Sequence, residues 1–292
     1  MVCVILDELK TYGPDRCAAL SVAGARAYTR RIARAHGENF SVATWLLPRG
    51  LREDFFAVYA FCRWADDLAD EAGGPERALG LLAWWREELD RCFAGRPRHP
   101  VFVALGPTLE KHGLPREPFT DLLDAFVRDQ TVCRYENWPQ LLDYCTRSAN
   151  PVGRLVLMMM GYRDQERFAL ADATCTALQL TNFWQDVRRD LMERGRVYLP
   201  ADLLAQHGAD LDQMAGLARL NRAALCDSCA VGRGGPAGAV AGLLRAYRAA
   251  LGELAGRTRP LFDRGRALWP EVRPQVRGDL QLFTLGLSLI HI

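Results

Sequence analysis

The sequence predicts an all-α protein, and three observations support that fold class. Apolar residues recur at intervals of three and four along most of the 292 residues, which is the spacing of a buried helix face. No two neighbouring segments show the alternation that paired strands require. Clusters of glycine and proline interrupt the pattern at intervals that suit helices, and none of them is long enough to be a linker.

The clearest predicted helix covers Asp54–Glu71. It follows the turn at residues 48–50, repeats apolar side chains at helical spacing, and stops before the Gly-Gly-Pro at residues 73–75. The same pattern, broken at residues 96–97, 113–115, 137–139, 195 and 232–238, predicts further helices at Arg77–Ala94, Val101–Lys111, Arg116–Thr131, Trp138–Thr146, Val152–Gly161, Gln165–Leu191, Leu211–Cys229 and Ala237–Phe262. With 49% hydrophobic residues these helices can bury a large core, and we expect one all-α domain over residues 1–286.

The composition excludes several function classes. The 37 basic residues are matched by 35 acidic ones, so the net charge of +2 gives no reason to expect nucleic acid as a partner. Nine cysteines without a metal-site or disulfide pattern favour reduced thiols in the cytoplasm, and the pair Cys226 and Cys229 is typical of two small residues on a helix. The amino terminus lacks the features of a signal peptide.

A membrane span is not expected either. The longest apolar run, Leu155–Met160, is far shorter than the roughly 20 residues that cross a bilayer, so any membrane contact is expected to be peripheral, at the inner face. The arginine-rich stretch Arg26–Arg34 suits such a contact, and an ordinary solvated surface explains it equally well. The sequence indicates no oligomeric state.

Two predicted helices each carry a pair of aspartates four residues apart, Asp66 with Asp70 and Asp186 with Asp190. Positions four apart lie on the same face of a helix, so each pair presents its carboxylates to one place. Oxygen ligands gathered in this way suit a hard divalent cation such as Mg²⁺. If the two pairs face each other, they can hold several such ions and, through them, a diphosphate.

The second pair belongs to a longer polar stripe. Gln179 and Asn182 lie on the same helix face as Asp186 and Asp190, and large apolar residues border the stripe on both sides. Burying such a stripe is costly unless it lines a cleft or binds an ion. The alternative is a solvated face with local ion pairs, for which Arg188, Arg189 and Arg194 are the candidate partners. A second acidic pair and an aligned amide favour the cation site.

Three basic or aromatic residues near the acidic pairs are candidates for contacting a diphosphate. Arg63 shares the helix face of Asp66, although an intrahelical pair with Asp66 or Asp67 is an equal alternative. Arg196 and Tyr198 follow the second acidic helix and could close over the same ligand. The alternative for this basic run is simple complementation of the helix dipole.

Four motifs together carry a family resemblance that covers about residues 36–200. They are L-L-P at Leu46–Pro48, Y-A-F-C-R-x-x-D-D-x-x-D at Tyr59–Asp70, Y-C-x-x-S-A at Tyr144–Ala149, and N-x-x-x-D-V-x-x-D-x-x-x-R-G-R-V-Y-L-P at Asn182–Pro200. In this combination the chain resembles the squalene/phytoene synthase family of head-to-head prenyltransferases. The resemblance implies the isoprenoid synthase fold, a single helical domain around a central cavity.

The resemblance also implies a chemistry, the Mg²⁺-assisted ionisation of an allylic or cyclopropylcarbinyl diphosphate, and a set of site residues. The family's metal positions match Asp66, Asp70, Asn182, Asp186 and Asp190, and the substrate positions match His36, Asn39, Phe40, Arg63, Gln179, Arg196 and Tyr198. The four aspartates and Tyr144 are the expected catalytic residues. Candidates for an apolar lining that keeps water from a carbocation are Tyr144, Phe40, Tyr59, Phe183 and Met158–Met160.

Three stretches point to one branch of the family. The sequences at Glu38–Ala43, Ser148–Gly153 and Asn182–Val187 resemble the bacterial hydroxysqualene synthases of hopanoid biosynthesis. Such an enzyme converts presqualene diphosphate and water to hydroxysqualene and diphosphate, so NADPH is not expected. The alternatives are a squalene or phytoene synthase that condenses two farnesyl or geranylgeranyl diphosphates, and a non-catalytic assembly factor of the same fold. Retention of all four aspartates argues against the assembly factor.

The carboxyl end departs from the family pattern. Relatives usually continue with another helical segment after the position of Gly286, whereas residues 287–292 form a short tail here. We expect a truncated or artefactual tail, and such an end would leave the cavity open on one side.

Overall fold

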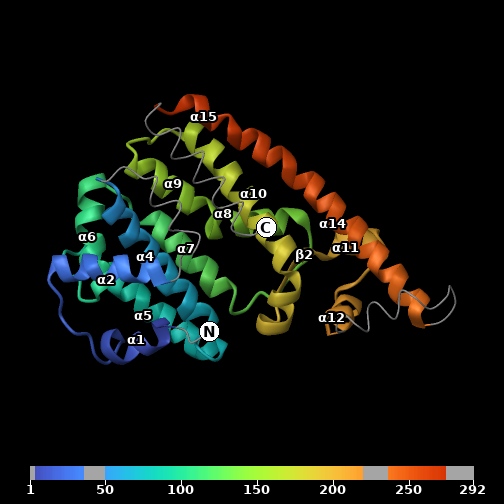
Figure 1. Ribbon diagram of the computed structural model, residues 1–292, viewed down its shortest axis with the longest axis horizontal. Helices are drawn as coiled ribbons and strands as arrows, with labels where there is room; N and C mark the ends of the chain where they lie inside the picture. The colour runs from blue at the N-terminus through green and yellow to red at the C-terminus, as the bar shows by residue number, and fades with distance from the viewer. Residues whose placement is uncertain (1–3, 36–49, 220–235, 274–292) are drawn as a thin grey trace.

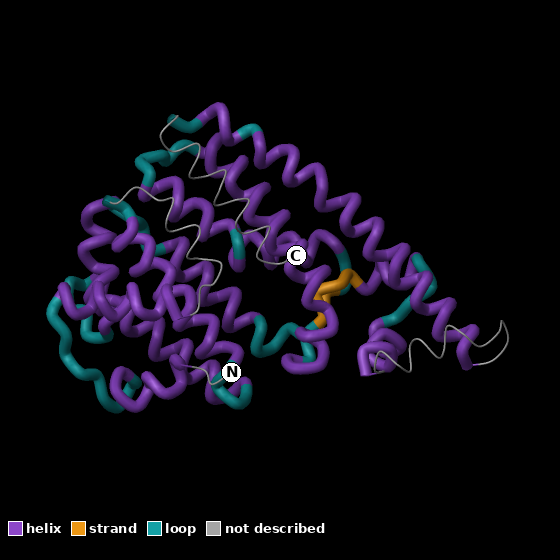
Figure 2. The backbone as a smooth tube through the Cα atoms, in the orientation of Figure 1, coloured by secondary structure: helices purple, strands orange, loops and turns teal. Residues whose placement is uncertain are grey.

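The computed structural model describes residues 4–35, 50–219 and 236–273, and almost every element in those ranges is helical (Figures 1 and 2). The predicted all-α class is therefore confirmed. The elements in chain order are α1 (Val4–Tyr12), α2 (Val22–Ala35), α4 (Arg52–Asp70), α5 (Pro75–Phe93), α6 (Pro100–His112), α7 (Glu117–Arg128), β1 (Arg134–Tyr135), α8 (Trp138–Ser148), α9 (Asn150–Met159), α10 (Gln165–Arg189), the π-helical turn η1 (Asp190–Arg194), β2 (Val197–Pro200), α11 (Ala201–Gln206), α12 (Leu211–Arg219), α14 (Pro236–Arg266) and α15 (Leu268–Glu271).

Helix α4, which carries the first acidic pair, runs through the largest apolar core. Helices α2, α5, α6 and α7 pack around it. The Trp64 indole is fully buried and stacks on Trp85 with ring centroids 5.1 Å apart, and Phe61 meets Phe119 edge to face. Burying a large apolar side chain contributes roughly 1.5–3 kcal/mol, so this face anchors α4 firmly. The helix is a rigid support for its carboxylates.

Helix α10, which carries the second acidic pair, packs against α9 and α14, and α14 runs beside it over much of its length (Figure 1). The Asp164 carboxylate caps its first turn by accepting a hydrogen bond of 3.0 Å from the backbone N–H of Arg167. Farther along, Trp184 Nε1 donates to Thr258 Oγ1 of α14 at 3.1 Å. These contacts fix the rotation of α10 and hence the direction of its polar stripe.

Two short strands differ from the sequence prediction, which contains none. Strands β1 and β2 pair in parallel, with Arg134 opposite Val197 and Tyr135 opposite Pro200. The backbone N–H of Val197 also donates to the Cys133 carbonyl at 2.9 Å. Strands this short carry no recognisable alternation, which is why the pattern does not reveal them. The pairing fixes the path of the chain just after the second acidic pair.

Within residues 4–35, 50–219 and 236–273, four helices that the sequence did not predict are present, namely α1, α2, α11 and α15. The buried face of α2 consists largely of small residues, Ala25, Thr29 and Ala33 beside Tyr28 and Ile32, so its apolar signal is weak. The helix predicted up to Cys229 is described only to Arg219, and the rest of that prediction lies outside the described residues. No helix in the described ranges is long and apolar enough to cross a membrane.

Candidate active site

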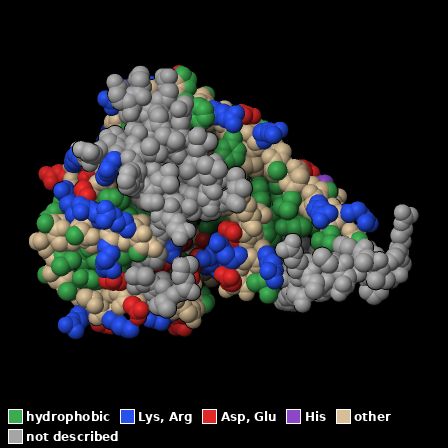
Figure 3. Space-filling view, viewed as in Figure 1, with side chains coloured by type: hydrophobic (Ala, Val, Ile, Leu, Met, Phe, Trp, Pro, Cys, Tyr) green, Lys and Arg blue, Asp and Glu red, His purple; other side chains and the backbone are tan. Residues whose placement is uncertain are grey.

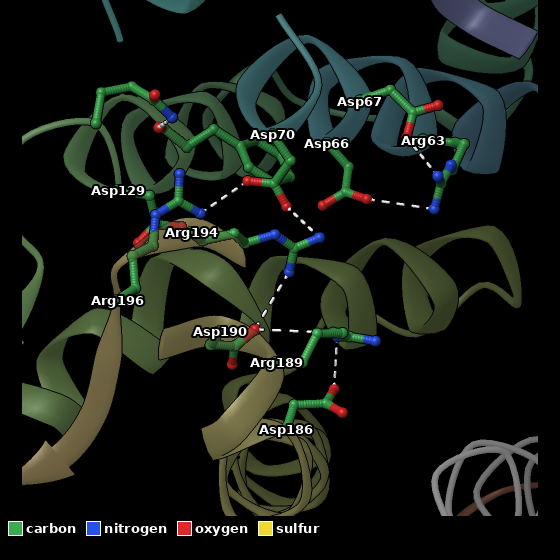
Figure 4. Close-up of polar contacts among 12 residues, drawn as sticks. Arg63, Asp66, Asp67, Asp70, Asp129, Asp186, Arg189, Asp190, Arg194 and Arg196 are labelled. Atoms are coloured by element: carbon green, nitrogen blue, oxygen red, sulfur yellow. Dashed lines mark hydrogen bonds and ion pairs between the residues drawn. The ribbon is translucent and has the colours of Figure 1, made fainter. Parts of the chain in front are cut away.

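The two acidic pairs come from α4 and from the end of α10, and they face each other (Figure 4). Asp66 and Asp70 lie in the last two turns of α4, Asp186 lies in the last turn of α10, and Asp190 begins the π-helical turn η1. The Asp70 and Asp190 side chains are almost buried, at 9% and 6% exposure, whereas that of Asp66 is 42% exposed. The site is thus accessible at one side and enclosed at the other.

The turn η1 determines where the following arginines point. It ends at Gly195, whose φ of +66° lies in the left-handed region that favours glycine. The backbone N–H of Arg196 then donates to the Asp190 carbonyl at 3.0 Å, and the chain enters β2. Single π-helical turns often occur at functional sites. Here the turn brings Arg194 and Arg196 against α4.

Arginine side chains join the two acidic helices. Arg194 Nη2 lies 2.9 Å from Asp70 Oδ2, and its Nη1 lies 3.3 Å from Asp190 Oδ1. Arg196 is 7% exposed, and its Nη1 donates to Asp70 Oδ1 at 2.7 Å. Asp70 is therefore contacted by two guanidinium groups that come from a segment more than a hundred residues away in sequence. Basic and acidic side chains lie side by side near the middle of the face in Figure 3.

The other arginines pair within their own helices. Arg63 contacts Asp67 and lies 3.3 Å from Asp66 Oδ2, so the intrahelical alternative for this residue is the arrangement in the structure. Arg189 Nη2 donates to Asp186 Oδ2 at 2.6 Å. Both arginines border the acidic pairs, and their role toward a diphosphate stays a prediction.

Desolvation, with a contribution from neighbouring carboxylates, disfavours the charged forms of two aspartates at the site. Desolvation by the surrounding helices and the neighbouring Asp70 carboxylate raise the pKa of Asp66 to about 7, even though 42% of its side chain is exposed, and Arg63 partly offsets the shift. Burial also raises the pKa of Asp190, and Arg194 opposes that effect. Carboxylates that resist ionisation in each other's presence gain most from an added cation. This is the electrostatic property expected of a divalent metal site.

The donor set fits a hard cation in its chemistry. All donors on the two helices are oxygens, and the stripe on α10 continues through Asn182 and Gln179, both partly exposed beside buried Leu180 and Phe183. Within the ranges that the structure describes, no three His, Cys, Asp or Glu side chains converge as metal ligands. The Arg194 guanidinium lies between two of the carboxylates that would have to converge.

An aromatic cluster lies beside the arginines, and two of its hydroxyl groups bind Asp129, a residue that the sequence did not single out. Asp129, 6% exposed, accepts a hydrogen bond from Tyr144 OH at 2.5 Å and from Tyr198 OH at 3.1 Å. Tyr198 in turn stacks on Phe183 with centroids 4.0 Å apart. Burial raises the pKa of Asp129 to about 6, opposed by the Arg196 charge and both hydroxyls. A lone aspartate at a helix end gives no periodic signal that would have found it.

The structure describes only some of the remaining predicted site residues. His36, Asn39 and Phe40, together with the Leu46–Pro48 motif, lie outside the described residues. Tyr59 is partly exposed on α4, whereas Met158–Met160 are buried in the large core around that helix. The sequence predicts Arg194 only as a local partner on its own helix. Its contact with α4 joins segments too distant in sequence for any spacing rule.

The fold and the facing acidic helices define an isoprenoid synthase fold. The squalene/phytoene synthase family description matches residues 33–286, so the chain belongs to that family. Its members are isoprenoid-synthesising enzymes that act on prenyl diphosphates, which confirms the predicted enzyme class. The crystal structure of squalene synthase HpnC from Alicyclobacillus acidocaldarius superposes with a TM-score of 0.77 at 40% identity, over 92% of each chain.

Two curated relatives are named for two different reactions of the family. A phytoene synthase from Thermus thermophilus is 35% identical over 81% of this chain and 72% of its own length. A hydroxysqualene synthase from Sinorhizobium fredii is 38% identical over 61% of this chain. That match spans only 60% of the relative's length. The relatives therefore agree on the family and differ in the reaction for which they are named.

Proposed function

We propose that this chain is a Mg²⁺-dependent synthase that converts presqualene diphosphate and water to hydroxysqualene and diphosphate. The observation that carries the proposal is the pair of acidic helices facing each other beside a buried tyrosine cluster. Similarity to hydroxysqualene synthases and the squalene synthase HpnC supports this member of the family's reactions. In this scheme a carbon–oxygen bond to diphosphate breaks, and a bond to a water oxygen forms as that water loses a proton.

The proposed metal ligands are Asp66, Asp70, Asn182, Asp186 and Asp190. Bound Mg²⁺ supplies positive charge that stabilises the departing diphosphate. Arg196 and Arg63 flank the acidic pairs, and their guanidinium groups are suited to donate hydrogen bonds to diphosphate oxygens. Gln179, His36 and Asn39 complete the proposed substrate contacts.

The tyrosine cluster is the proposed wall beside the reacting carbons. Tyr144, Tyr198 and Phe183 present aromatic faces to one another, and Asp129 holds both hydroxyl groups. Aromatic rings tolerate a nearby carbocation because of their quadrupoles, and they exclude bulk water. With Tyr59 and Phe40, these side chains are the candidates for contact with the prenyl chains.

A second candidate reaction is the head-to-head condensation of two farnesyl or geranylgeranyl diphosphates to a squalene- or phytoene-type product. The similarity to a phytoene synthase over 81% of the chain favours it. The acidic pairs would have the same role in both reactions. The two candidates differ in substrate and in the fate of the cation.

Product analysis by mass spectrometry distinguishes the candidates. The purified chain is incubated with Mg²⁺ and either presqualene diphosphate or farnesyl diphosphate, without NADPH, and a parallel sample contains EDTA. Hydroxysqualene formed from presqualene diphosphate, and only with Mg²⁺, is the expected result. Presqualene diphosphate or a hydrocarbon formed from farnesyl diphosphate would move the assignment to the condensing synthase. No turnover of either substrate would contradict both.

We also propose a cytoplasmic enzyme, with residues 1–286 as one domain and with peripheral contact to the inner face of the membrane. The apolar product suggests delivery to a bilayer. In the arginine-rich helix α2, Arg30 pairs with Glu53 at 2.5 Å and Arg31 with Glu8 at 2.8 Å, whereas Arg26 and Arg34 form no ion pair with any described residue. Co-sedimentation with anionic vesicles tests the contact, and recovery of all the protein in the supernatant would contradict it.

A further inference from the structure

We propose that Arg194 is the internal counter-cation of the site, which holds Asp70 and Asp190 in place and competes with a divalent metal ion for their oxygens. This inference rests on the proposed function, because it assumes that the acidic pairs bind metal. It assigns Arg194 a positioning role, exerted through the carboxylates that it contacts.

The Arg194 guanidinium contacts carboxylates on both acidic helices. Arg194 uses one terminal nitrogen for Asp70 on α4, at 2.9 Å, and the other for Asp190 at the start of η1, at 3.3 Å. It therefore spans the gap between the two acidic helices. Arg196 differs, because its ion pair is with Asp70, and Arg189 differs because it contacts Asp186 and Asp190 on its own segment.

Both carboxylates that Arg194 contacts are buried. The carboxylates of Asp70 and Asp190 are 9% and 6% exposed, so little water is available to solvate their charge. Placing two such carboxylates near each other is unfavourable unless a cation lies between them. Arg194, itself 27% exposed, provides that cation and can still move toward solvent.

Arg194 and a divalent ion compete for the same carboxylates. A divalent ion bound between Asp70 Oδ2 and Asp190 Oδ1 would lie where the Arg194 guanidinium now lies, and two positive groups cannot share that position. Metal binding must therefore displace the guanidinium. A planar guanidinium released beside the metal is well suited to bidentate contact with diphosphate oxygens. The exchange would couple metal binding to substrate binding without moving either acidic helix.

Metal binding without substrate tests this directly. Mn²⁺ alone is titrated into the full chain and free Mn²⁺ is followed by electron paramagnetic resonance. We expect Arg194→Gln to bind Mn²⁺ several-fold more tightly than wild type, because no internal cation has to be displaced. Arg194→Lys, which keeps the positive charge, should bind Mn²⁺ with an affinity close to that of wild type. Arg266→Gln removes an exposed arginine of α14, 66% exposed and paired only loosely with Asp263, and should leave the affinity unchanged.

Melting in EDTA provides the second readout. Loss of the bridge should lower the melting temperature of Arg194→Gln relative to Arg194→Lys when metal is absent, and added Mn²⁺ should close that gap. Arg194→Met, which keeps much of the aliphatic stem, repeats both measurements if the glutamine variant does not fold. Equal or weaker Mn²⁺ binding in the neutral variants would overturn the inference alone. Failure of the wild-type chain to bind Mn²⁺ would contradict both this inference and the proposed metal site.

Discussion

At the scale of single residues, charge is the property that organises the site. The Asp70 carboxylate forms ion pairs with Arg194 and Arg196. The Asp129 carboxylate accepts hydrogen bonds from two tyrosine hydroxyls. Each of these buried carboxylates therefore fixes a group of neighbouring side chains. Arg196 connects them, because its charge also opposes the rise in the pKa of Asp129. The acidic pairs and the tyrosine cluster are therefore electrostatically coupled.

Replacing Asp129 tests its raised pKa through the pH dependence of stability. Burial raises its pKa to about 6 from an ordinary value of 3.8, so the folded protein binds this proton more tightly than the unfolded chain does. The stabilisation from protonation is complete below pH 3.8 and is lost as the pH rises through 6. The amide introduced by Asp129→Asn cannot titrate. The free energy of unfolding of wild type, relative to Asp129→Asn, should thus fall by roughly 3 kcal/mol between acid and neutral pH.

Urea unfolding of both proteins across that range provides the measurement. A difference between them that stays constant with pH would show that Asp129 does not titrate as the buried geometry requires. Tyr144→Phe provides a matched comparison, because it removes one of the hydroxyl donors and leaves the carboxylate in place.

At the scale of elements, the segment from the end of α10 through η1 to β2 positions the arginines. The π-helical turn and the left-handed Gly195 redirect the chain so that Arg194 and Arg196 reach α4. The direction of these side chains depends on the backbone of five residues and one glycine. The segment is therefore the element most sensitive to local backbone change.

Two glycine substitutions separate this backbone requirement from helix propensity. Gly195→Ala places a side chain at a φ of +66°, which costs about 1–2 kcal/mol for an ordinary residue. Gly256→Ala lies inside α14, where an added Cβ meets nothing within 4 Å, and should stabilise by about 0.5–1 kcal/mol. Chemical denaturation should give shifts of opposite sign. A neutral or stabilising Gly195→Ala would mean that the turn tolerates other backbone conformations.

The sequence anticipates features that depend on local spacing and misses those that depend on distant contacts. The helix of Asp66 and Asp70, and the stripe from Gln179 to Asp190, follow from the helical period alone. The bridge from Arg194 and the carboxylate of Asp129 depend on how segments far apart in sequence pack together. Helix ends are predicted to within a few residues, and β1 and β2 are too short to carry a pattern.

At the scale of the whole molecule, the site joins two packed groups of helices. Helix α4 belongs to the core shared with α2, α5, α6 and α7, whereas α10 packs on α9 and α14. A ligand that binds both acidic pairs therefore contacts both groups of helices at once and stabilises their packing. Anything that binds the folded protein alone raises its stability by mass action.

Added Mg²⁺ should therefore raise the melting temperature, and more at pH 8 than at pH 5.5. The pKa of Asp66 is raised to about 7, so at pH 5.5 a metal ion must displace a proton from this carboxyl, whereas at pH 8 the carboxylate is already ionised. Scanning calorimetry at both pH values measures the effect. In Asp66→Asn the gain from Mg²⁺ should be smaller and less dependent on pH. A larger gain at pH 5.5 in wild type would contradict this assignment.

Diphosphate release from presqualene diphosphate by wild type, Asp66→Ala and Asp186→Ala tests directly whether the two acidic pairs form one metal site. Asp263→Ala is the matched control, because that side chain is 63% exposed on α14 and away from the site. If both acidic helices form one metal site, release requires Mg²⁺, and each site variant loses roughly a hundredfold or more in rate while its circular dichroism is unchanged. The control should keep the wild-type rate. An undiminished rate in either site variant would contradict the central claim that the two acidic pairs act together.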